Sequence, residues 1–219
     1  MYKTSDLYNL EKTIAKPFLE HFLYPWEALS GIGDFIKEYG KTLPADEFFS
    51  PIEDIYISRS AVIADTASIT APCIICEGAE LRHGAFIRGN VIVGKNAVVG
   101  NSVELKNVIL FDEVQVPHFN YVGDSILGFK AHMGAGSITS NVKGDRSLVE
   151  IKFGDERIET GIKKVGAMLG DAAEIGCNCV LNPGCVVGRG SMIYPLCSIR
   201  GVVPENSIYK SDTNIIEKK

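Results

Sequence analysis

The chain has 219 residues and a formal charge of −5, from 22 basic and 27 acidic side chains. An acidic composition disfavours general nucleic-acid binding, which needs a basic surface. Hydrophobic residues make up 46% and charged residues 22%, as in ordinary globular proteins. No apolar run is long enough to cross a membrane, and the N-terminus has no signal-peptide core. We therefore expect a cytoplasmic protein that binds neither nucleic acid nor membranes.

Residues 1–50 form the first expected unit, an N-terminal helical cap and linker. Apolar side chains recur at three- and four-residue steps over about 5–22 and again over about 26–39, as on one face of a helix. The apolar positions are Leu7, Leu10, Ile14, Phe18 and Phe22, then Trp26, Leu29, Ile32, Phe35 and Ile36. We expect this unit to cap the open end of the next domain, where sheet edges would otherwise be exposed.

From residue 57 onward, aliphatic side chains recur every six residues. The two runs are Ile57, Ile63, Ile69, Ile75, Leu81, Ile87, Val93, Val99 and Leu105, and then Leu169, Ile175, Leu181, Val187, Ile193 and Ile199. From Ala61 onward, a small or slender residue stands two positions before each of them. A period of six fits neither a helix nor simple strand alternation. It predicts an all-β domain over residues 51–205, a parallel β-helix of about seven coils, each of 18 residues.

Four cysteines occupy the small position of this repeat, namely Cys73, Cys179, Cys185 and Cys197. We interpret them as reduced packing residues inside the coil. Disulfides or a metal site are the alternative, but the chain has no pair of Cys-x-x-Cys motifs, so we predict no metal site.

The repeat is interrupted where we expect special structure. Its register slips by one residue between Leu105 and Leu110, and again between Val122 and Leu127. Over residues 140–164 the repeat is lost, and an alternating apolar stretch leads into a Gly-Asp pair, which predicts an inserted β-hairpin loop. Insertions of this kind often carry the binding function of a solenoid. Residues 206–219 are expected to form a C-terminal tail.

The 18-residue coil predicts which distant residues are neighbours. Arg88 and Lys106 each follow an aliphatic position one coil apart, so their cations should stack at about one strand spacing. Two such cations repel unless an anion such as a phosphate lies between them. Allowing for the slips, His118, Tyr121 and Asn141 fall near the same strip of surface. Solvated surface charges and a structural corner histidine are the alternative interpretation.

The repeat resembles that of the hexapeptide-repeat acyltransferases, which implies a left-handed coil. Three stretches extend this resemblance: Val103-Glu-Leu-Lys-Asn, Pro117-His-Phe-Asn-Tyr-Val-Gly-Asp and Gly134-Ala-Gly-Ser-Ile-Thr-Ser-Asn. They are similar to the acetyltransferase half of bifunctional N-acetylglucosamine-1-phosphate uridyltransferase/glucosamine-1-phosphate acetyltransferases. They are equally similar to the C-terminal half of archaeal-type sugar-1-phosphate nucleotidylyltransferases. The nucleotidyltransferase half has no counterpart here, so the chain resembles a truncated, pyrophosphorylase-related member.

The resemblance implies an enzyme, an acetyl-CoA-dependent N-acetyltransferase in UDP-N-acetylglucosamine biosynthesis. Its acceptor would be an amino-sugar 1-phosphate, with glucosamine 1-phosphate favoured, and Mg²⁺ would not be required for acetyl transfer. His118 would be the general base and Asn141 would contact the sugar beside it. By position, the other implied residues are Arg88, Lys106, Tyr121 and His132 for the substrate, and Ala135, Cys177 and Arg200 for acetyl-CoA. The resemblance also implies a homotrimer with sites between subunits.

One position departs from the motif, since His132 stands where the family often has asparagine. The choice of amino sugar is therefore open at this point. An acyltransferase that uses a nucleotide-linked sugar is one alternative function. A non-catalytic trimeric scaffold that binds sugar phosphates is another.

Overall fold

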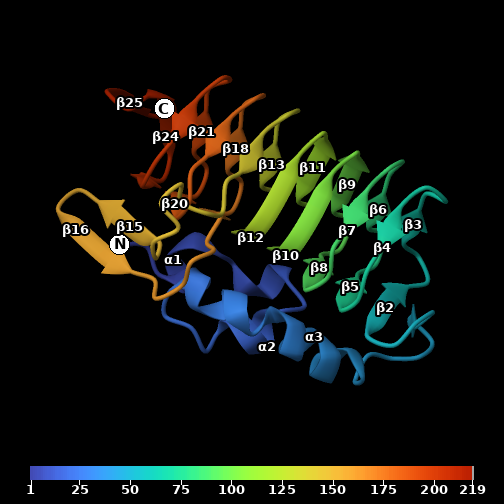
Figure 1. Ribbon diagram of the computed structural model, residues 1–219. Coiled ribbons are helices and arrows are strands. Elements are labelled where there is room, and N and C mark those ends of the chain that lie inside the picture. The colour runs from blue at the N-terminus through green and yellow to red at the C-terminus, as the bar shows by residue number, and fades with distance from the viewer. Residues whose placement is uncertain (219) are drawn as a thin grey trace.

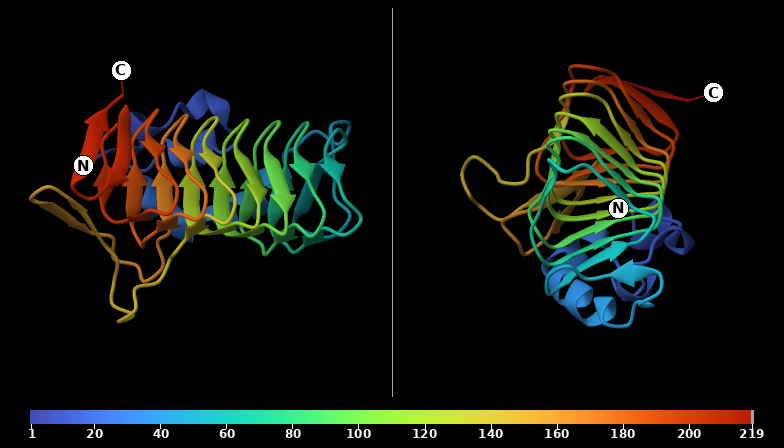
Figure 2. Two further views of the ribbon diagram at one scale, coloured as in Figure 1. Left: turned by 90° about the horizontal axis from the view of Figure 1, so that it is seen from above. Right: turned by 90° about the vertical axis from the view of Figure 1, so that its right-hand side faces the viewer.

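The computed structural model describes residues 1–218 and is built around a parallel β-helix with three faces (Figures 1 and 2). The first face contains β2 (Ile55–Ser58), β5 (Cys73–Ile75), β8 (Val91–Val93), the ends of β10 (Glu104–Leu110) and β12 (Tyr121–Leu127), β17 (Ala167–Leu169), β20 (Cys185–Val187) and β23 (Val202–Val203). The second contains β3 (Val62–Ile63), β6 (Glu80–Leu81), β9 (Val98–Asn101), β11 (Gln115–His118), β13 (His132–Met133), β18 (Glu174–Ile175), β21 (Met192–Ile193) and β24 (Ser207–Ser211). The third contains β4 (Ser68–Ile69), β7 (Phe86–Ile87), the starts of β10 and β12, β14 (Ile138–Thr139), β19 (Val180–Leu181) and β22 (Ser198–Ile199).

The β-helix predicted from the six-residue repeat is confirmed. Within residues 1–218 the pairing gives seven complete coils and two sides of an eighth. The aliphatic residues point inward and are almost all buried, with Ile63 and Ile69 in the first coil only half-buried. Cys73, Cys179 and Cys185 are buried in the small inward position, and the six cysteines are unpaired.

Both predicted slips are present in the strand register. Leu105 pairs with Ile87, eighteen positions earlier, whereas Val108 pairs with Val91, only seventeen positions earlier. The next coil is also seventeen residues long at Ser125, which pairs with Val108. Because β10 and β12 run unbroken around a corner, they join the first and third faces into one sheet.

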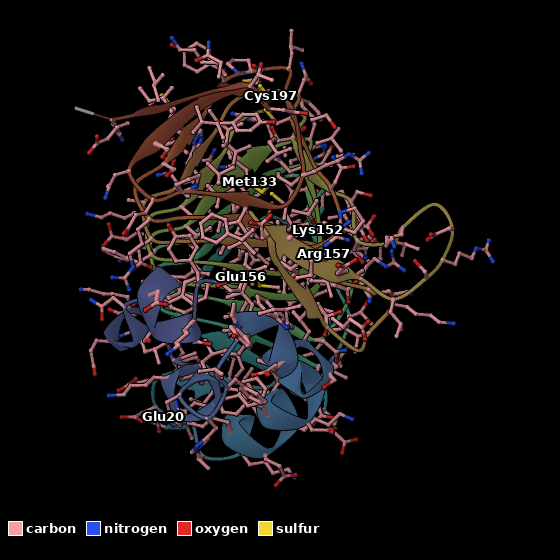
Figure 3. The ribbon with its side chains drawn as sticks, turned by 90° about the vertical axis from the view of Figure 1, so that its left-hand side faces the viewer. Glu20, Met133, Lys152, Glu156, Arg157 and Cys197 are labelled. Atoms are coloured by element: carbon pink, nitrogen blue, oxygen red, sulfur yellow. The ribbon has the colours of Figure 1, made fainter. Side chains whose placement is uncertain are left out.

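The predicted insertion is confirmed as a hairpin of β15 (Glu150–Phe153) and β16 (Glu156–Glu159). Figure 3 shows Lys152, Glu156 and Arg157 on this hairpin, which leaves the β-helix on the side of its C-terminal coils. Val149 and Ile151 are buried against the coils, where Gly184 provides the room for them.

The N-terminal segment is helical but more broken than predicted. Its elements are α1 (Thr4–Leu7), η1 (Leu10–Lys12), α2 (Lys16–Leu19), η2 (Pro25–Ser30) and α3 (Ile32–Gly40). The single helix expected over 5–22 is wrong because Tyr8 and Thr13 are extended, and α2 starts anew with Pro17 in its first turn.

This segment runs along the β-helix rather than over its open end, as Figure 1 shows. The hydroxyl of Tyr2 accepts a hydrogen bond from the Glu205 backbone near the last coil, whereas α3 packs on β5, β8 and β10. The expected cap at the open end is therefore wrong. Residues 1–40 instead form a segment that lies along the length of the β-helix (Figure 1), which we call the N-terminal strap. At the open end, β1 (Phe48–Phe49) covers only the edge of β2, by antiparallel pairing.

The C-terminal residues form strands where we expected a tail from residue 206. β24 continues the second face by parallel pairing with β21, and β25 (Asn214–Glu217) folds back on it. Tyr209 is buried in the inward position that Ile193 occupies on the preceding coil. The last coil is shortened, because Val203 pairs with Val187, only sixteen positions earlier. A strict step of six from Ile199 therefore does not predict Tyr209 as an inward residue.

Candidate active site

Arg88 and Lys106 lie at the corner between the third and first faces. Ile87 pairs with Leu105 and Leu105 with Val122, so Arg88, Lys106 and Gly123 follow one another on successive coils. Arg88 and Lys106 therefore occupy the same corner on neighbouring coils. Each cation also pairs with its own carboxylate, which the spacing of the coils alone does not predict.

These two ion pairs differ in their exposure. Arg88 Nη1 lies 2.6 Å from a carboxylate oxygen of Glu104, and both side chains are partly exposed. Lys106 Nζ lies 2.9 Å from Asp124 Oδ1, and the Asp124 side chain is only 4% exposed. The exposed pair contributes little to stability, but the buried carboxylate requires its partners.

Tyr121 and Asn141 join this corner from the next coils. The Asn141 side-chain amide donates to the Tyr121 hydroxyl at 3.2 Å and also to the Asp124 carboxylate. Burial raises the pKa of the Tyr121 phenol, and the charge of Asp124 adds to this effect. We call Arg88, Lys106, Tyr121, Asp124 and Asn141 the cationic corner.

His118 lies at the other edge of the third face, at the corner with the second face. It pairs with Asn101 on the preceding coil, and its carbonyl accepts a hydrogen bond from Gly136 N at 3.0 Å. On the next coil, the Ala135 carbonyl accepts from Asn178 N at 2.8 Å. The corner therefore places His118 beside Ala135 and Cys177, which were predicted separately as base and acetyl-CoA residues.

A buried asparagine fixes the backbone of this histidine corner. Asn120 accepts a hydrogen bond from His118 N at 3.1 Å and donates to Gly134 O and Ser137 O at 2.8 and 2.9 Å. Asn120 occupies the small inward position two residues before Val122, and it is 3% exposed. Its amide links two successive coils of the corner.

The predicted residues thus form two groups rather than one strip. Arg88, Lys106, Tyr121 and Asn141 meet at one edge of the third face, and His118 lies at its other edge. Tyr121 starts the strand that leads from the histidine corner to the cationic corner. The third face between these two edges is where an acceptor and an acyl donor would have to meet.

His132 lies on the second face, away from the cationic corner. Its Nδ1 is 3.1 Å from a Glu174 carboxylate oxygen on the next coil. Both residues line a cavity of about 330 Å³ together with Cys177, Tyr194 and Pro195. The structure thus brings His132 to the side of Cys177 rather than to the predicted substrate residues.

Arg200 lies at the corner between the third and first faces, four coils beyond Lys106, and not beside Ala135 or Cys177. It lines a cavity of about 530 Å³ with Ser140, Lys143 and Asn182, at the base of the inserted loop. A second cavity of about 510 Å³ shares Lys143, Asn182 and Arg200 and extends to Lys152.

Another cavity, of about 720 Å³, contains none of the predicted site residues. It lies between the N-terminal strap and the first coils, and its lining includes Tyr39, Phe48, Arg59, Lys95 and Asp112. Among residues 1–218, no group of three or more His, Cys, Asp or Glu side chains could hold a metal ion. None of the helices described has the length and apolarity needed to span a membrane.

Several known proteins are similar to this chain in sequence. A family model described as the GMPPB C-terminal domain matches residues 69–152. A "Bifunctional protein GlmU" from Methanococcus maripaludis is 32% identical over 215 residues, covering 90% of this chain and 48% of that protein. A "Bifunctional sugar-1-phosphate nucleotidylyltransferase/acetyltransferase" from Sulfurisphaera tokodaii is 30% identical over 151 residues, covering 61% of this chain and 38% of that protein.

Among solved structures, a hexapeptide transferase family protein from Anaplasma phagocytophilum covers 74% of this chain and 76% of its own, at 17% identity and a TM-score of 0.41. The chain spans about half the length of the curated GlmU relative it matches. The resemblance inferred from the three motif stretches is confirmed: this chain is related in sequence to the acetyltransferase-type region of bifunctional GlmU-type proteins.

Proposed function

We propose that the chain transfers the acetyl group of acetyl-CoA to the amine of an amino-sugar 1-phosphate, with glucosamine 1-phosphate as the favoured acceptor. The observation that carries this proposal is the stacking of Arg88 and Lys106 on one edge of a face whose other edge carries His118. The relationship to GlmU-type bifunctional proteins supports the same reaction class. The product would feed UDP-N-acetylglucosamine synthesis.

The cationic corner would hold the acceptor. A phosphate dianion beside Arg88 and Lys106 gains charge-assisted hydrogen bonds from a planar guanidinium and a mobile ammonium. Tyr121 and Asn141, which already contact each other, would hydrogen-bond the sugar. With its phosphate held at this edge, the amino group of the sugar would lie over the third face and be directed toward the histidine edge.

His118 would act as the general base. The nitrogen of the acceptor attacks the thioester carbonyl of acetyl-CoA, the carbon–sulfur bond breaks, and CoA leaves as the thiol. The imidazole removes a proton from the amine during this attack and passes it to the departing sulfur, acting as general base and then as general acid, a pair of roles common for histidine. No covalent enzyme intermediate is needed. Ala135 and Cys177 would line the path of the pantetheine chain beside the imidazole.

A second copy of the chain would complete the site, in a homotrimer. The two corners lie on opposite edges of one face, so a neighbouring chain that covers this face would close the space between them. Large apolar side chains that are exposed on this face or at its histidine edge support such a contact. They are Phe86, Phe119, Tyr194 and Leu196, with 37% to 79% of their surface accessible.

The assay for this proposal is CoA release with acetyl-CoA and glucosamine 1-phosphate. His118→Ala should lower kcat by about 10²- to 10⁴-fold if the imidazole is the base. The matched control is His83→Ala, because His83 lies in the same corner two coils earlier and hydrogen-bonds Thr66. Unchanged turnover in His118→Ala would remove this residue from the mechanism. Absence of wild-type turnover with every amino-sugar 1-phosphate would instead favour the scaffold.

A nucleotide-linked amino sugar is the second candidate acceptor. The cationic corner continues past Asn141 into the cavity lined by Lys143 and Arg200, which adds two cations and space beside the sugar position. A diphosphate could lie along these side chains. If this acceptor is the true one, kcat/KM for a UDP-linked amino sugar exceeds that for glucosamine 1-phosphate, and Arg200→Ala removes the difference.

A further inference from the structure

Asp124 is a buried carboxylate at the centre of the cationic corner. Only 3% of the residue is exposed, and three side chains donate hydrogen bonds to it. Lys106 Nζ reaches both oxygens at 2.9 and 3.3 Å, Asn107 donates to Oδ1 at 2.9 Å, and Asn141 donates to Oδ2. Two of these donors, Lys106 and Asn141, belong to the proposed acceptor site.

The backbone holds Asp124 rigidly in this position. Its φ of +48° lies in the left-handed region, which aspartate and asparagine adopt more readily than most residues. Asn90 and Asn107 have the same conformation at the same corner, each directly before a strand of the first face. The Asp124 carbonyl also accepts a hydrogen bond from Gly166 N at 2.7 Å, which ties the corner to the chain that returns from the inserted loop.

Asn107 connects this carboxylate to the N-terminal strap. Its side-chain amide has two hydrogens, and both are used: one bonds to Asp124 Oδ1 and the other to the Leu29 carbonyl in η2, at 3.1 Å. The amide is buried, so neither bond is easily replaced by water. The N-terminal strap thus contacts the cationic corner through Asn107.

We propose that Asp124 is the positioning residue of the acceptor site, holding the Lys106 ammonium and the Asn141 amide in place for a sugar phosphate, and that Asn107 anchors this carboxylate to the N-terminal strap. The proposal rests on the proposed function of the cationic corner. Lysine loses considerable rotamer freedom when it binds a ligand, and a counter-ion that has already fixed the ammonium lowers this cost. The same carboxylate orients Asn141, whose amide then holds the Tyr121 hydroxyl.

The test substitutes the carboxylate by its isosteric amide, Asp124→Asn. This change keeps the shape of the side chain but leaves the Lys106 ammonium without its counter-ion. The new NH₂ group would also face the amide NH₂ of either Asn107 or Asn141, which now donates to a carboxylate oxygen. The expected result is an acceptor KM raised at least about tenfold, with KM for acetyl-CoA within about twofold of wild type. A purely structural role would change both constants together or neither.

A matched pair of variants tests the link to the strap. Asn107→Asp leaves Asp124 in place but removes the two donated hydrogen bonds and adds a repelling charge, so we expect the acceptor KM to rise there as well. Asn90→Asp makes the same change one coil earlier, at a corner that does not contact Asp124, and should leave both KM values within about twofold. This pair decides the question even if Asp124→Asn fails to fold.

A crystal structure of Asp124→Asn separates this proposal from the proposed function. The positioning role requires Lys106 Nζ and Asn141 Nδ2 to move from their wild-type positions in that variant. If both stay in place, or if Asp124→Asn and Asn107→Asp raise the two KM values equally, the proposal is overturned. Absence of wild-type turnover with any amino-sugar phosphate refutes the proposed function instead, whatever the variant structure shows.

Discussion

Asn120→Ala should destabilise the fold while leaving its packing almost unchanged. Alanine fits the small inward position, since Ala85 occupies the same place two coils earlier. The substitution removes three hydrogen bonds, from His118 N and to Gly134 O and Ser137 O. At about 1 kcal/mol for each bond, with the partners left buried, the free energy of unfolding should fall by about 3 kcal/mol.

Thermal and denaturant unfolding at one fixed protein concentration measure this loss. For a chain of this size, about 3 kcal/mol corresponds to a fall in Tm of roughly 6–12 °C. Asn101→Ala is the control, because Asn101 lies at the same corner but makes one exposed bond, to His83 O. Its cost should stay below about 1 kcal/mol. A loss below about 0.5 kcal/mol in Asn120→Ala would refute the view that this amide holds the histidine corner together.

Three further predictions concern the corners, the thiols and the phosphate. Gly100→Ala should lower the free energy of unfolding by about 3 kcal/mol or more, because the added Cβ would lie 1.6 Å from Pro117 O. The control Gly144→Ala adds a Cβ with no atom within 4 Å, so it should lower this free energy by less than about 0.5 kcal/mol. Equal losses in denaturant unfolding would contradict the close approach of the two coils at Gly100. Iodoacetamide at pH 8 should label the exposed Cys177 of the native protein but not the buried Cys73, Cys76 and Cys185, as measured by peptide mass spectrometry. Burial raises the pKa of each of these three thiols to about 12, so they stay protonated and unreactive at this pH. Lys106→Ala should raise KM for the sugar phosphate more than KM for acetyl-CoA, and equal increases would contradict a phosphate-binding role.

Periodicity predicted the β-helix well because every coil must place an aliphatic side chain inside. The five-residue steps to Leu110 and Leu127 even located the two shortened coils. The same rule failed in the last coil, where the corner between Ile199 and Val203 is two residues shorter and an aromatic residue, Tyr209, takes the next inward position. Periodicity also did not predict that the N-terminal strap lies along the coils. Apolar spacing shows which side of a helix is buried, but not which surface it is buried against.

The candidate site shows a similar division. Spacing by coils predicted that Arg88 lies beside Lys106 and that His118 lies at the corner leading into the Val122 strand, because strand register alone fixes those positions. Asp124 was missed because a buried carboxylate leaves no trace in hydrophobic periodicity. One signal was available: Asn90, Asn107 and Asp124 recur at seventeen-residue steps directly before first-face strands, as expected for a column of left-handed corners.

A crystal structure with glucosamine 1-phosphate and CoA bound tests the central claim most directly. The account predicts the phosphate between Arg88 and Lys106, the sugar against Tyr121 and Asn141, and the amine directed at the imidazole of His118 from the same or a neighbouring copy. A sugar phosphate bound elsewhere, with these residues facing only solvent or a subunit contact, would contradict the account.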